Sequence, residues 1–270
     1  MTTGRRISEL MTMGGRTALV TGGAGFIGRA AGEVLAEAGA NVVLADMDGA
    51  AAKETAEALA ATFGVSASGV AIDLADEAAV RDLPVRVHAD YGGLDVIVHA
   101  AAFVGTSDLE GWVVPFEEQT ADTWRAAMDV NLTSLFVLVQ AALPYLKEKG
   151  MGSVIGLSSI YGVDGPDMRL YEGLDMGNPA AYAASKGGMI QLARWMATVL
   201  APEVRVNTIT PGGIYRNQPE TFVKRYEDRT PLSRMGTEED MKGALMYLAS
   251  DLSRYVTGQN LIVDGGWTVW

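Results

Sequence analysis

The sequence predicts an α/β fold in which one parallel sheet of seven strands is covered by helices on both faces. Short runs rich in Val, Ile and Leu alternate with longer Ala-rich stretches from residue 16 onward. No linker rich in Pro, Ser or charge divides the 270 residues. Alternation of this kind is typical of parallel strands joined by crossover helices. We therefore expect a single doubly wound domain over residues 14–270, preceded by an N-terminal extension over residues 1–13.

Seven short runs are the candidate strands, and six longer stretches between them are the candidate helices. The expected strands cover residues 17–21, 40–46, 69–74, 94–101, 152–159, 204–210 and 260–266. The expected helices cover residues 26–38, 49–63, 76–91, 122–148, 180–200 and 238–250. Helix N-caps are expected at Asp48, Asp76, Asp122 and Thr237, the last together with Asp240.

Two connections depart from this alternation, residues 161–178 and residues 212–236. Both follow candidate strands, and both are longer than ordinary connections in such folds. The carboxyl ends of parallel strands meet at one edge of the sheet, where open α/β sheets hold their ligands. We therefore expect these two segments to be lids over a substrate.

The composition favours a protein that binds a small molecule. Asp and Glu number 33 against 21 Lys and Arg, and the net charge of −12 disfavours nucleic acid or an anionic membrane as partner. Apolar runs end well before the roughly 18 residues of a membrane span. The chain has no cysteine, and His88 and His99 are not spaced as a ligand pair, so no metal site is expected. Residues 1–13 lack the apolar core of a signal peptide, so we expect a cytoplasmic location.

The first candidate strand leads into a glycine-rich turn, "TGGAGFIG", and then into a helix. Glycines at 22, 23, 25 and 28 permit a tight turn and let backbone N–H groups at the helix N-terminus approach a pyrophosphate. A tight turn without a ligand is the alternative interpretation.

The second candidate strand ends in Asp46, about 20 residues beyond the turn, where a carboxylate can accept hydrogen bonds from the adenosine ribose. The same charge repels a 2′-phosphate, so we predict NAD rather than NADP. Helix capping beside Asp48 is the alternative role. Asp73 is a candidate for the adenine contact and, equally, for a loop cap.

Tyr182 and Lys186 stand four residues apart in "YAASKGG", on one face of a candidate helix. A neighbouring ammonium and the positive charge of an oxidised nicotinamide stabilise a phenolate, and we expect them to lower the pKa of Tyr182 by about 2 to 3 units. Tyr182 then becomes a general acid/base near neutral pH. An aromatic ring packed on a lysine stem is the alternative.

Together with the turn and this pair, further motifs resemble the short-chain dehydrogenase/reductase family, from about residue 15 to the C-terminus. They are "DVNLTSLF", "SSIYG", "RVNTITPGG" and "YVTGQNLIVDGGW". The resemblance implies a Rossmann-type fold and a catalytic set of Asn131, Ser159, Tyr182 and Lys186. In that set Tyr182 is the acid/base and Ser159 holds the substrate oxygen. Lys186 binds the nicotinamide ribose, and Asn131 anchors a water that relays protons to Lys186.

The resemblance also implies a cofactor site, a supporting hydrogen bond from Ser158, and assembly. The helices over 122–148 and 180–200 form subunit interfaces in this family, so we expect a homotetramer, with a dimer as the alternative. The cofactor contacts implied are Gly22, Gly25, Phe26, Ile27, Gly28, Asp46, Asp73, Leu74, Ala100, Ala101, Tyr182, Lys186, Pro211, Gly212 and Ile214.

Two departures from the compact members of the family are visible. The turn reads T-G-x-x-G-x-x-G, with Phe26 where a glycine is usual, and "HAAA" replaces "NNAG" after the fourth candidate strand. Both features are typical of the larger sugar-nucleotide epimerases and dehydratases, whose added substrate domain this chain has no room for. We expect a compact enzyme in which His99 is a structural hydrogen-bond donor.

The third departure is an insertion of residues between Ser159 and Tyr182. It holds four acidic residues against the single Arg169, and carboxylates and a tyrosine are suited to gripping hydroxyls. This favours a sugar, sugar derivative or polyol as substrate, unless the acids only solvate the loop. The four are Asp164, Asp167, Glu172 and Asp175.

The residues therefore predict an NAD-dependent oxidoreductase that interconverts a secondary alcohol and a ketone on a small molecule. An epimerase or dehydratase that uses NAD transiently is the alternative enzyme. A nucleotide-sensing protein without turnover is the alternative from another class, and retention of all four catalytic residues speaks against it.

Overall fold

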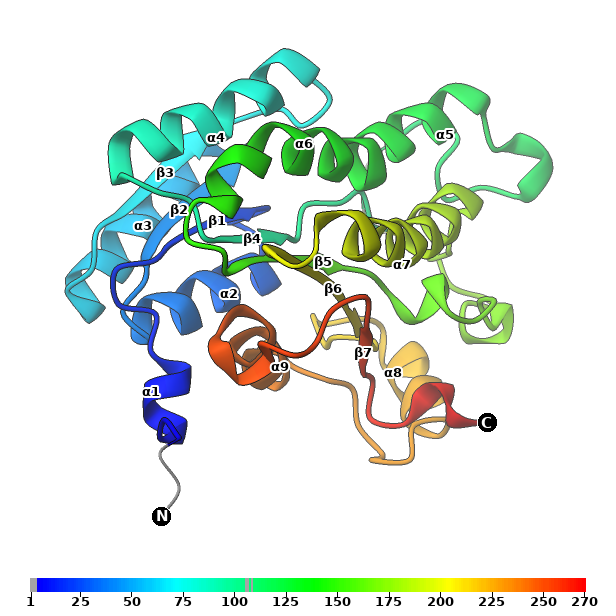
Figure 1. The fold of residues 1–270 in the computed structure, drawn as a ribbon. Coiled ribbons are helices and arrows are strands. Elements are labelled where there is room, and N and C mark those ends of the chain that lie inside the picture. The colour runs from blue at the N-terminus through cyan, green and yellow to red at the C-terminus, as the bar shows by residue number, and fades with distance from the viewer. Residues whose placement is uncertain (1–3, 105–106, 108) are drawn as a thin grey trace.

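The computed structural model describes residues 4–104, 107 and 109–270, and within them the predicted seven-stranded parallel sheet is present (Figure 1). The strand order is β3-β2-β1-β4-β5-β6-β7, and the sheet forms one Rossmann-like domain. All strands are parallel, and the chain changes the side on which it adds strands between β3 and β4. The strands are β1 (Thr17–Thr21), β2 (Asn41–Asp46), β3 (Ala67–Ala71), β4 (Val96–His99), β5 (Gly152–Leu157), β6 (Val204–Pro211) and β7 (Asn260–Val263).

Helices cover both faces of this sheet. Successive side chains of a strand point to opposite faces, so each strand packs against both layers of helices. In β1, Leu19 packs with one layer, formed by α4 (Glu77–Tyr91), α6 (Ser134–Lys147) and α7 (Ala180–Leu200). Ala18 and Val20 pack with the other layer, formed by α2 (Phe26–Glu37), α3 (Gly49–Phe63) and α9 (Glu239–Ala249). Both faces are buried by helices, which is why the strand sequences are continuous apolar runs.

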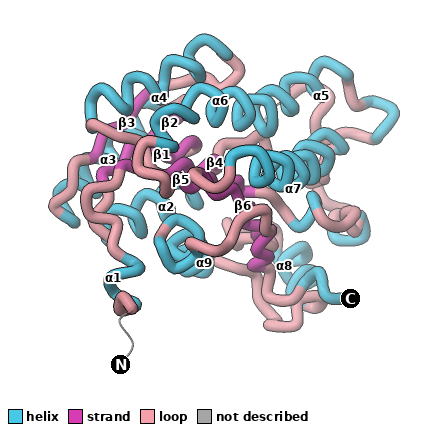
Figure 2. The backbone as a smooth tube through the Cα atoms, viewed as in Figure 1, coloured by secondary structure: helices cyan, strands magenta, loops and turns pink. Residues whose placement is uncertain are grey.

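Three further helices lie outside these layers (Figure 2). α1 (Ile7–Met11) belongs to the N-terminal extension, α5 (Ala121–Met128) precedes α6, and α8 (Glu220–Glu227) lies within the second predicted lid. The single helix expected over 122–148 is present as one helical stretch, Ala121–Lys147, in which a π-helical turn, Asp129–Thr133, lies between α5 and α6. The segment 212–236 is not the simple loop that the sequence led us to expect, because it contains α8.

Several predicted boundaries are wrong by a few residues. β3 ends at Ala71, so the expected strand over 69–74 stops before Asp73. β4 and β5 are also shorter than predicted, ending at His99 and Leu157. β7 ends at Val263 because Gly265 and Gly266 adopt positive φ angles of 67° and 90°, which turn the chain out of the sheet.

Two of the four predicted helix caps are confirmed. Asp48 accepts a hydrogen bond from the Ala51 N–H, and Asp76 accepts from the first turn of α4. Asp122 is not a cap, because Thr120 accepts from the Thr123 N–H instead. At α9 one half of the predicted capping box is present.

There Asp240 accepts hydrogen bonds from the backbone N–H and the hydroxyl of Thr237, at 2.7 and 3.1 Å. The Asp240 carboxylate therefore makes its half of the predicted capping box, whereas the Thr237 side chain accepts no hydrogen bond from the helix.

One helical stretch, Ala121–Lys147, is long and apolar enough by composition to cross a membrane. Half of it is buried in the protein, and core helices of soluble proteins meet the same criterion. Leu135, Leu138 and Leu146 of α6 pack in the main core. The apolar character of this stretch is thus accounted for by packing against the sheet.

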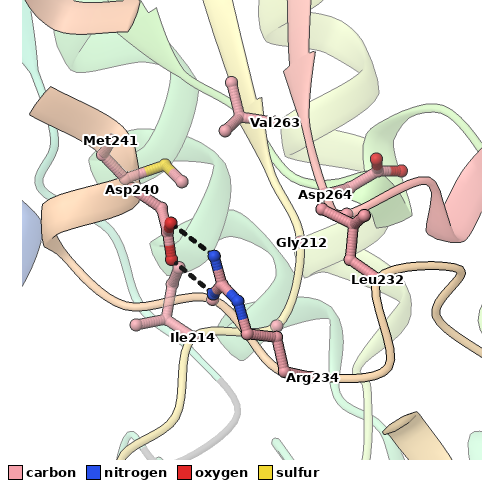
Figure 3. A pocket seen from close by; sticks show the side chains of 11 residues that line it. Gly212, Ile214, Leu232, Arg234, Asp240, Met241, Val263 and Asp264 are labelled. Carbon is pink, nitrogen blue, oxygen red and sulfur yellow. Dashed lines mark hydrogen bonds and ion pairs between the residues drawn. The ribbon is translucent and has the colours of Figure 1, made fainter. Parts of the chain in front are cut away.

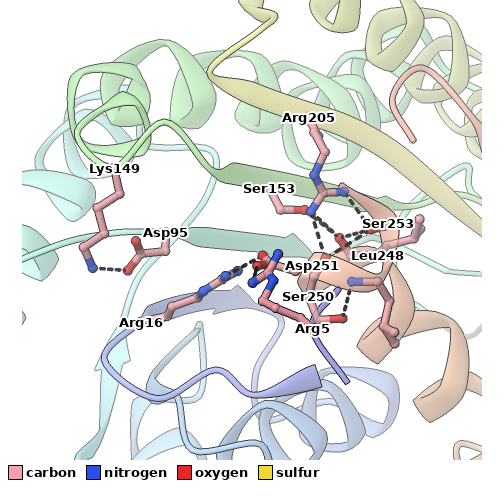
Figure 4. Close-up of polar contacts among 11 residues, drawn as sticks. Arg5, Arg16, Asp95, Lys149, Ser153, Arg205, Leu248, Ser250, Asp251 and Ser253 are labelled. Carbon is pink, nitrogen blue, oxygen red and sulfur yellow. Dashed lines mark hydrogen bonds and ion pairs between the residues drawn. The ribbon is translucent and has the colours of Figure 1, made fainter. Parts of the chain in front are cut away.

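The amino edge of the sheet holds a network of charges in which Asp251, Asp95 and Arg16 are buried (Figure 4). Arg16, just before β1, and Arg5 of the N-terminal extension both bind the carboxylate of Asp251, each at 2.5 Å. Asp95, before β4, accepts from the Thr17 N–H at 2.9 Å and pairs with Lys149 at 3.0 Å. The network ties the extension and four strand connections together.

Candidate active site

A cavity of about 990 Å³ opens at the carboxyl edge of the sheet, between the glycine turn and the two lids. All the residues predicted to contact the cofactor line this cavity, from Gly22 to Ile214. Ser159, Tyr182 and Lys186 line it as well, whereas Asn131 does not. The strand order reverses beside it, which is where open α/β sheets bind ligands.

The glycine turn is packed so tightly that side chains are excluded. A Cβ on Gly22 would lie 2.7 Å from the Ala101 nitrogen, and one on Gly28 would lie 1.9 Å from the Gly22 oxygen. Gly22 also has a positive φ of 66°, and Gly25 is the residue that precedes α2. The turn thereby presents the bare N-terminus of α2 to the cavity, which suits a pyrophosphate.

Asp46 ends β2 with its carboxylate fixed beside this turn. Its two oxygens accept from the Ala24 N–H at 2.9 Å and the Asp48 N–H at 3.0 Å. Asp48, and not Asp46, caps the following helix. Asp46 therefore presents a fixed negative charge to the cavity and retains lone pairs for ribose hydroxyls.

Asp73 has both features that the sequence left open. It accepts a hydrogen bond from the Ala75 N–H at 2.9 Å, which is the loop-cap role. It also lines the cavity next to Leu74, where an adenine contact was predicted.

His99 is buried and does not face the cavity. Its Nδ1 lies 3.0 Å from the Thr21 hydroxyl and its Nε2 lies 3.4 Å from the Ser134 hydroxyl. Burial, with a smaller effect of the Lys186 charge, lowers the pKa of His99 to about 3, so the ring is neutral. The ring joins β1 to α6, in agreement with the structural role predicted for it.

The chemical centre of the cavity is formed by α7 and the residues just after β5. On α7, the Lys186 Nζ lies 5.7 Å from the centre of the Tyr182 ring and donates to the Leu157 carbonyl at 2.6 Å. The predicted supporting role of Ser158 is confirmed, since its hydroxyl donates to the Lys186 carbonyl at 2.9 Å. Ser159 accepts from the Tyr161 N–H, which directs its hydroxyl at the start of a 3₁₀ turn.

The chain's own groups do not lower the pKa of Tyr182, and the predicted lowering, which includes the charge of an oxidised nicotinamide, stays a prediction. Burial raises the pKa of this phenol, and the Ser159 hydrogen bond and the Arg216 charge offset only part of that rise. Burial also lowers the pKa of Lys186 to about 7, so its charge is weakened as a source of phenolate stabilisation. Desolvation is the largest effect among the chain's own groups, so a lowered pKa would depend on the charge of an oxidised nicotinamide.

Asn131 lies on the π-helical turn and is completely buried. Its side-chain oxygen accepts from the Phe103 N–H at 2.7 Å, and its side-chain nitrogen donates to the Ser185 hydroxyl at 3.1 Å. Asn131 thus holds the segment after β4 against α7. The side chain is occupied by these bonds, so the predicted water-anchoring role of this residue stays a prediction.

The first lid lines the cavity with fewer acids than expected. Of the four acidic residues, Asp175 alone faces the cavity, together with Tyr171 and Asn178. Asp164 and Glu172 are exposed. The remaining acid is not available either.

That acid, Asp167, is paired with Arg169 and Arg229. The Arg169 hydrogen bond is the main reason that the pKa of Asp167 is lowered. It joins the first lid to the second, so its charge serves structure and not a substrate.

Aromatic packing joins the two lids above the chemical centre. The hydroxyls of Tyr161 and Tyr171 are 2.7 Å apart, and Tyr171 packs on Phe222 of α8. The Tyr226 hydroxyl accepts from the Gly213 N–H, which ties α8 to the end of β6. Arg225 donates to the Glu172 carbonyl at 2.7 Å.

Several cavity residues were not predicted from the sequence. Phe222 and Tyr226 stand four apart, a helical spacing that is visible in "ETFVKRYE" and could have indicated α8. No local pattern indicates the others. Phe103 and Val104 lie outside the predicted lids, whereas Tyr161, Met176, Asn178, Arg216, Gln218 and Met235 lie within the two segments predicted as lids.

A smaller pocket of about 120 Å³ adjoins the main cavity behind Gly212 and Ile214 (Figure 3). Arg234 of the second lid crosses it to pair with Asp240 of α9 at 2.7 Å. The hydrogen bond from Arg234 is the main reason that the pKa of Asp240 is well below its ordinary value. This ion pair anchors the second lid to α9.

Within the described residues, no group of three or more His, Asp or Glu side chains is placed to hold a metal ion. The site instead combines a phenol, an ammonium, a hydroxyl and a glycine cradle. These are groups for moving a proton beside a bound dinucleotide.

Comparisons with known proteins agree with this geometry. The family model described as enoyl-(acyl carrier protein) reductase matches residues 22–268. The 2,5-dichloro-2,5-cyclohexadiene-1,4-diol dehydrogenase of Sphingobium indicum is 31% identical, over 95% of this chain and 98% of that protein. The sorbose reductase of Schizosaccharomyces pombe is 32% identical, over 97% and 99% of the two chains.

Two solved structures share the whole fold. The NADPH-dependent 3-quinuclidinone reductase of Rhodotorula rubra superposes with a TM-score of 0.87 at 28% identity, over 100% of this chain and 97% of that one. A short-chain dehydrogenase of Leptospira borgpetersenii with bound NAD⁺ gives 0.81 at 30% identity, over 99% and 98%. The chain therefore belongs to the short-chain dehydrogenase/reductase family of oxidoreductases.

Proposed function

We propose that this chain is an NAD(H)-dependent oxidoreductase that interconverts a secondary alcohol and a ketone. The observation that carries the proposal is the convergence of Ser159, Tyr182 and Lys186 with the glycine turn and Asp46 on one cavity. A bound nicotinamide ring would accept or donate the hydride. The chain itself would hold the substrate oxygen and move its proton.

In this proposal the Ser159 hydroxyl binds the substrate oxygen and directs it at the phenol of Tyr182. In the reduction direction Tyr182 donates its proton to that oxygen, and in the oxidation direction it accepts the proton back. A tyrosine phenol is protonated at neutral pH, as ketone reduction requires, and burial raises its pKa further. Lys186, held by the Leu157 carbonyl, contributes positive charge beside the phenolate during oxidation.

Asp46 supports NAD over NADP. Its carboxylate is held at the cavity by two backbone N–H groups and cannot swing away from a 2′-phosphate. A fixed charge there opposes a second negative charge and accepts hydrogen bonds from free ribose hydroxyls. The two structural relatives differ in cofactor, one being NADPH-dependent and one containing NAD⁺, so the preference rests on Asp46 itself.

The lid residues support a substrate that carries several hydroxyls on a ring. Asp175 and Asn178 line the cavity wall, where Asp175 offers a carboxylate, and the Asn178 side-chain oxygen is buried without a hydrogen-bond partner among the described residues. Tyr171 and Phe222 offer aromatic faces for the C–H side of such a ring. The sugar or polyol hypothesis is thereby narrowed to cyclic polyhydroxylated alcohols. The names of the diol dehydrogenase and the sorbose reductase are compatible with it.

A panel of cyclic polyols, sugars and simple cyclic ketones, each with NAD(H) and NADP(H), tests the proposal by absorbance of the reduced nicotinamide. We expect turnover with NAD(H) and a secondary alcohol or its ketone. Tyr182→Phe should lower turnover by about 10² to 10⁴, because the general acid/base is lost. Its affinity for NADH should stay within about twofold, since the glycine turn is unchanged.

The variant that tests the substrate contact is Asp175→Asn, which keeps the size of the side chain and removes its charge. We expect a higher KM for the polyhydroxylated substrate and an unchanged KM for NAD. Turnover of no member of the panel with either cofactor would contradict the proposal. The family comparisons contain dehydrogenases and reductases, so the epimerase alternative is not carried further.

For assembly we propose a homotetramer. Large apolar side chains are exposed on the outer faces of α5, α6 and α7, among them Trp124, Phe136 and Trp195, at 41%, 40% and 57%. Trp270 at the C-terminus is 73% exposed. Light scattering after gel filtration tests this proposal, and a monomeric mass of 28.5 kDa would contradict it.

A further inference from the structure

Phe26 stands where compact members of the family have a glycine, and its ring has a partner from the opposite side of the cavity. Phe26 begins α2 and is 60% exposed. The guanidinium carbon of Arg216, from the second lid, lies 4.2 Å from the centre of this ring. The two residues form a cation–π contact between the glycine turn and the lid.

The position of Arg216 is fixed by the lid around it. Its backbone N–H donates to the Gln218 side chain at 2.6 Å, and Gln218 in turn donates to the Ile214 carbonyl at 2.8 Å. Its Nε lies 3.2 Å from a carboxylate oxygen of Glu238. The two terminal nitrogens of the guanidinium make no hydrogen bond to any described residue.

Among the residues lining the cavity, Lys186 and Arg216 are the two that carry positive charge. Lys186 is 3% exposed and its Nζ is already bonded to the Leu157 carbonyl. Arg216 has a third of its side chain exposed and two free N–H₂ groups. It is therefore the cation available to an anion at the N-terminus of α2.

We propose that Arg216 binds the pyrophosphate of the dinucleotide, and that Phe26 orients the guanidinium for this contact. The inference rests on the proposed function, because it presupposes that a dinucleotide occupies the cavity. Arginine is suited to the role, since its planar group can give two parallel hydrogen bonds to phosphate oxygens while one face stacks on an aromatic ring. The contact also fastens the second lid over the cofactor, so dinucleotide binding and lid position become linked.

Equilibrium titrations with three probes test the proposal without any need for turnover. NADH is followed by its fluorescence, and ADP-ribose and adenosine are followed as competitors that displace it. ADP-ribose contains the pyrophosphate, whereas adenosine contains only the base and ribose. The Arg216→Gln variant is compared with Lys224→Gln, which removes one positive charge from the exposed surface of the same lid and does not line the cavity.

We expect Arg216→Gln to weaken NADH and ADP-ribose about 10- to 100-fold, the range for charge-assisted hydrogen bonds, and to leave adenosine within twofold. Arg216→Lys should lose less, because the charge remains. Phe26→Leu should weaken both pyrophosphate ligands severalfold, because the guanidinium keeps its charge and loses its orienting ring. Lys224→Gln should behave as the wild type.

Equal affinity of Arg216→Gln and the wild type for ADP-ribose would overturn the proposal. A parallel loss of adenosine affinity would also overturn it, because Arg216 would then shape the pocket and not recognise phosphate. If the wild type itself binds neither NADH nor NADPH, the proposed function fails together with this inference. Thermal unfolding of each variant identifies any that does not fold, and Phe26→Leu then provides the test.

Discussion

The two edges of the sheet use charged side chains in opposite ways. At the amino edge, Asp251 is 6% exposed and both of its oxygens are bound by Arg5 and Arg16 (Figure 4). At the carboxyl edge, Arg216 has unbonded nitrogens and Asp175 faces open cavity. Asp251 is thus satisfied within the chain, whereas Asp175 and the two terminal nitrogens of Arg216 are available to a ligand, although the Arg216 Nε pairs with Glu238.

This difference assigns stability to the first edge and chemistry to the second. Burial alone would raise the pKa of Asp251, yet the hydrogen bonds from Arg16 and Arg5 outweigh it, and the pKa is lowered. At the carboxyl edge burial prevails, since the pKa of Tyr182 is raised and that of Lys186 is lowered to about 7. Of these two shifts, that of Lys186 brings a pKa near neutral pH, whereas that of Tyr182 keeps the phenol protonated.

The largest expected effect tests the amino edge. Asp251→Asn leaves Arg16 buried without a charged partner, so we expect the free energy of unfolding at pH 7 to fall by about 3 kcal/mol. NADH affinity should not change, because the cavity is at the other edge. Chemical denaturation and NADH titration at pH 7 make the measurement.

The pH dependence of the same variant sharpens the test. The pKa of Asp251 is lower in the folded chain, so its stabilisation is present above about pH 4 and is lost as the pH falls through the folded value. The difference between wild type and Asp251→Asn should therefore shrink in acid. A difference that grows toward low pH would contradict the ion-pair explanation.

The second effect tests the carboxyl edge. Gly28→Ala places a methyl group 1.9 Å from the Gly22 oxygen, so the turn must open. We expect NADH affinity to fall about 100-fold, or about 2.7 kcal/mol. Isothermal titration makes the measurement, and tight NADH binding by this variant would show that the turn does not hold the cofactor.

Asp46→Ala should alter cofactor choice by about tenfold, or about 1.4 kcal/mol. Removing the carboxylate eliminates both the ribose contact and the repulsion of a 2′-phosphate. The ratio of kcat/KM for NAD to that for NADP measures the effect. An unchanged ratio would remove the basis for the NAD proposal.

A smaller effect tests the lids. Tyr171→Phe removes the hydroxyl that lies 2.7 Å from that of Tyr161, a neutral hydrogen bond worth about 1 kcal/mol. We expect KM for the alcohol to rise about fivefold while NADH affinity is unchanged. Steady-state kinetics with each substrate varied in turn makes the measurement. A loss of affinity confined to NADH would contradict the prediction, because it would show that this lid serves the cofactor.

The smallest effect is a control for both edges. A Cβ on Gly243, within α9, would meet no atom within 4 Å. Gly243→Ala should therefore raise the free energy of unfolding by about 0.5 to 1 kcal/mol, through helix propensity, and leave kinetics unchanged. Thermal unfolding checks it, and destabilisation would show that α9 lacks the space described.

The first half of the chain could be predicted well from sequence because its site is made by the backbone. The spacing of Gly22 and Gly28, and the strand end at Asp46, are local patterns that a sequence displays directly. The pair on α7 was likewise visible from helical spacing. The burial that raises the pKa of Tyr182 is not visible from that spacing, because it depends on the whole fold.

The side-chain contacts of the lids and of the amino edge could not be predicted from the sequence, for a related physical reason. Asp167 pairs with an arginine 62 residues away, and Arg16 with a carboxylate 235 residues away. Phe26 was noticed as an exception, but its meaning depends on Arg216, which no local pattern connects to it. Such contacts are decided by packing between distant segments.

The central claim is that this cavity exchanges a hydride between a carbinol carbon and a nicotinamide while Tyr182 moves the hydroxyl proton. The most direct test uses an alcohol from the substrate panel, deuterated at the carbinol carbon, with NAD⁺ and NMR of the reduced cofactor. We predict that the wild type places deuterium at C4 of the nicotinamide and forms the ketone, and that Tyr182→Phe does so at a rate lower by about 10² or more. Unlabelled reduced cofactor, or an equal rate in Tyr182→Phe, would contradict the claim.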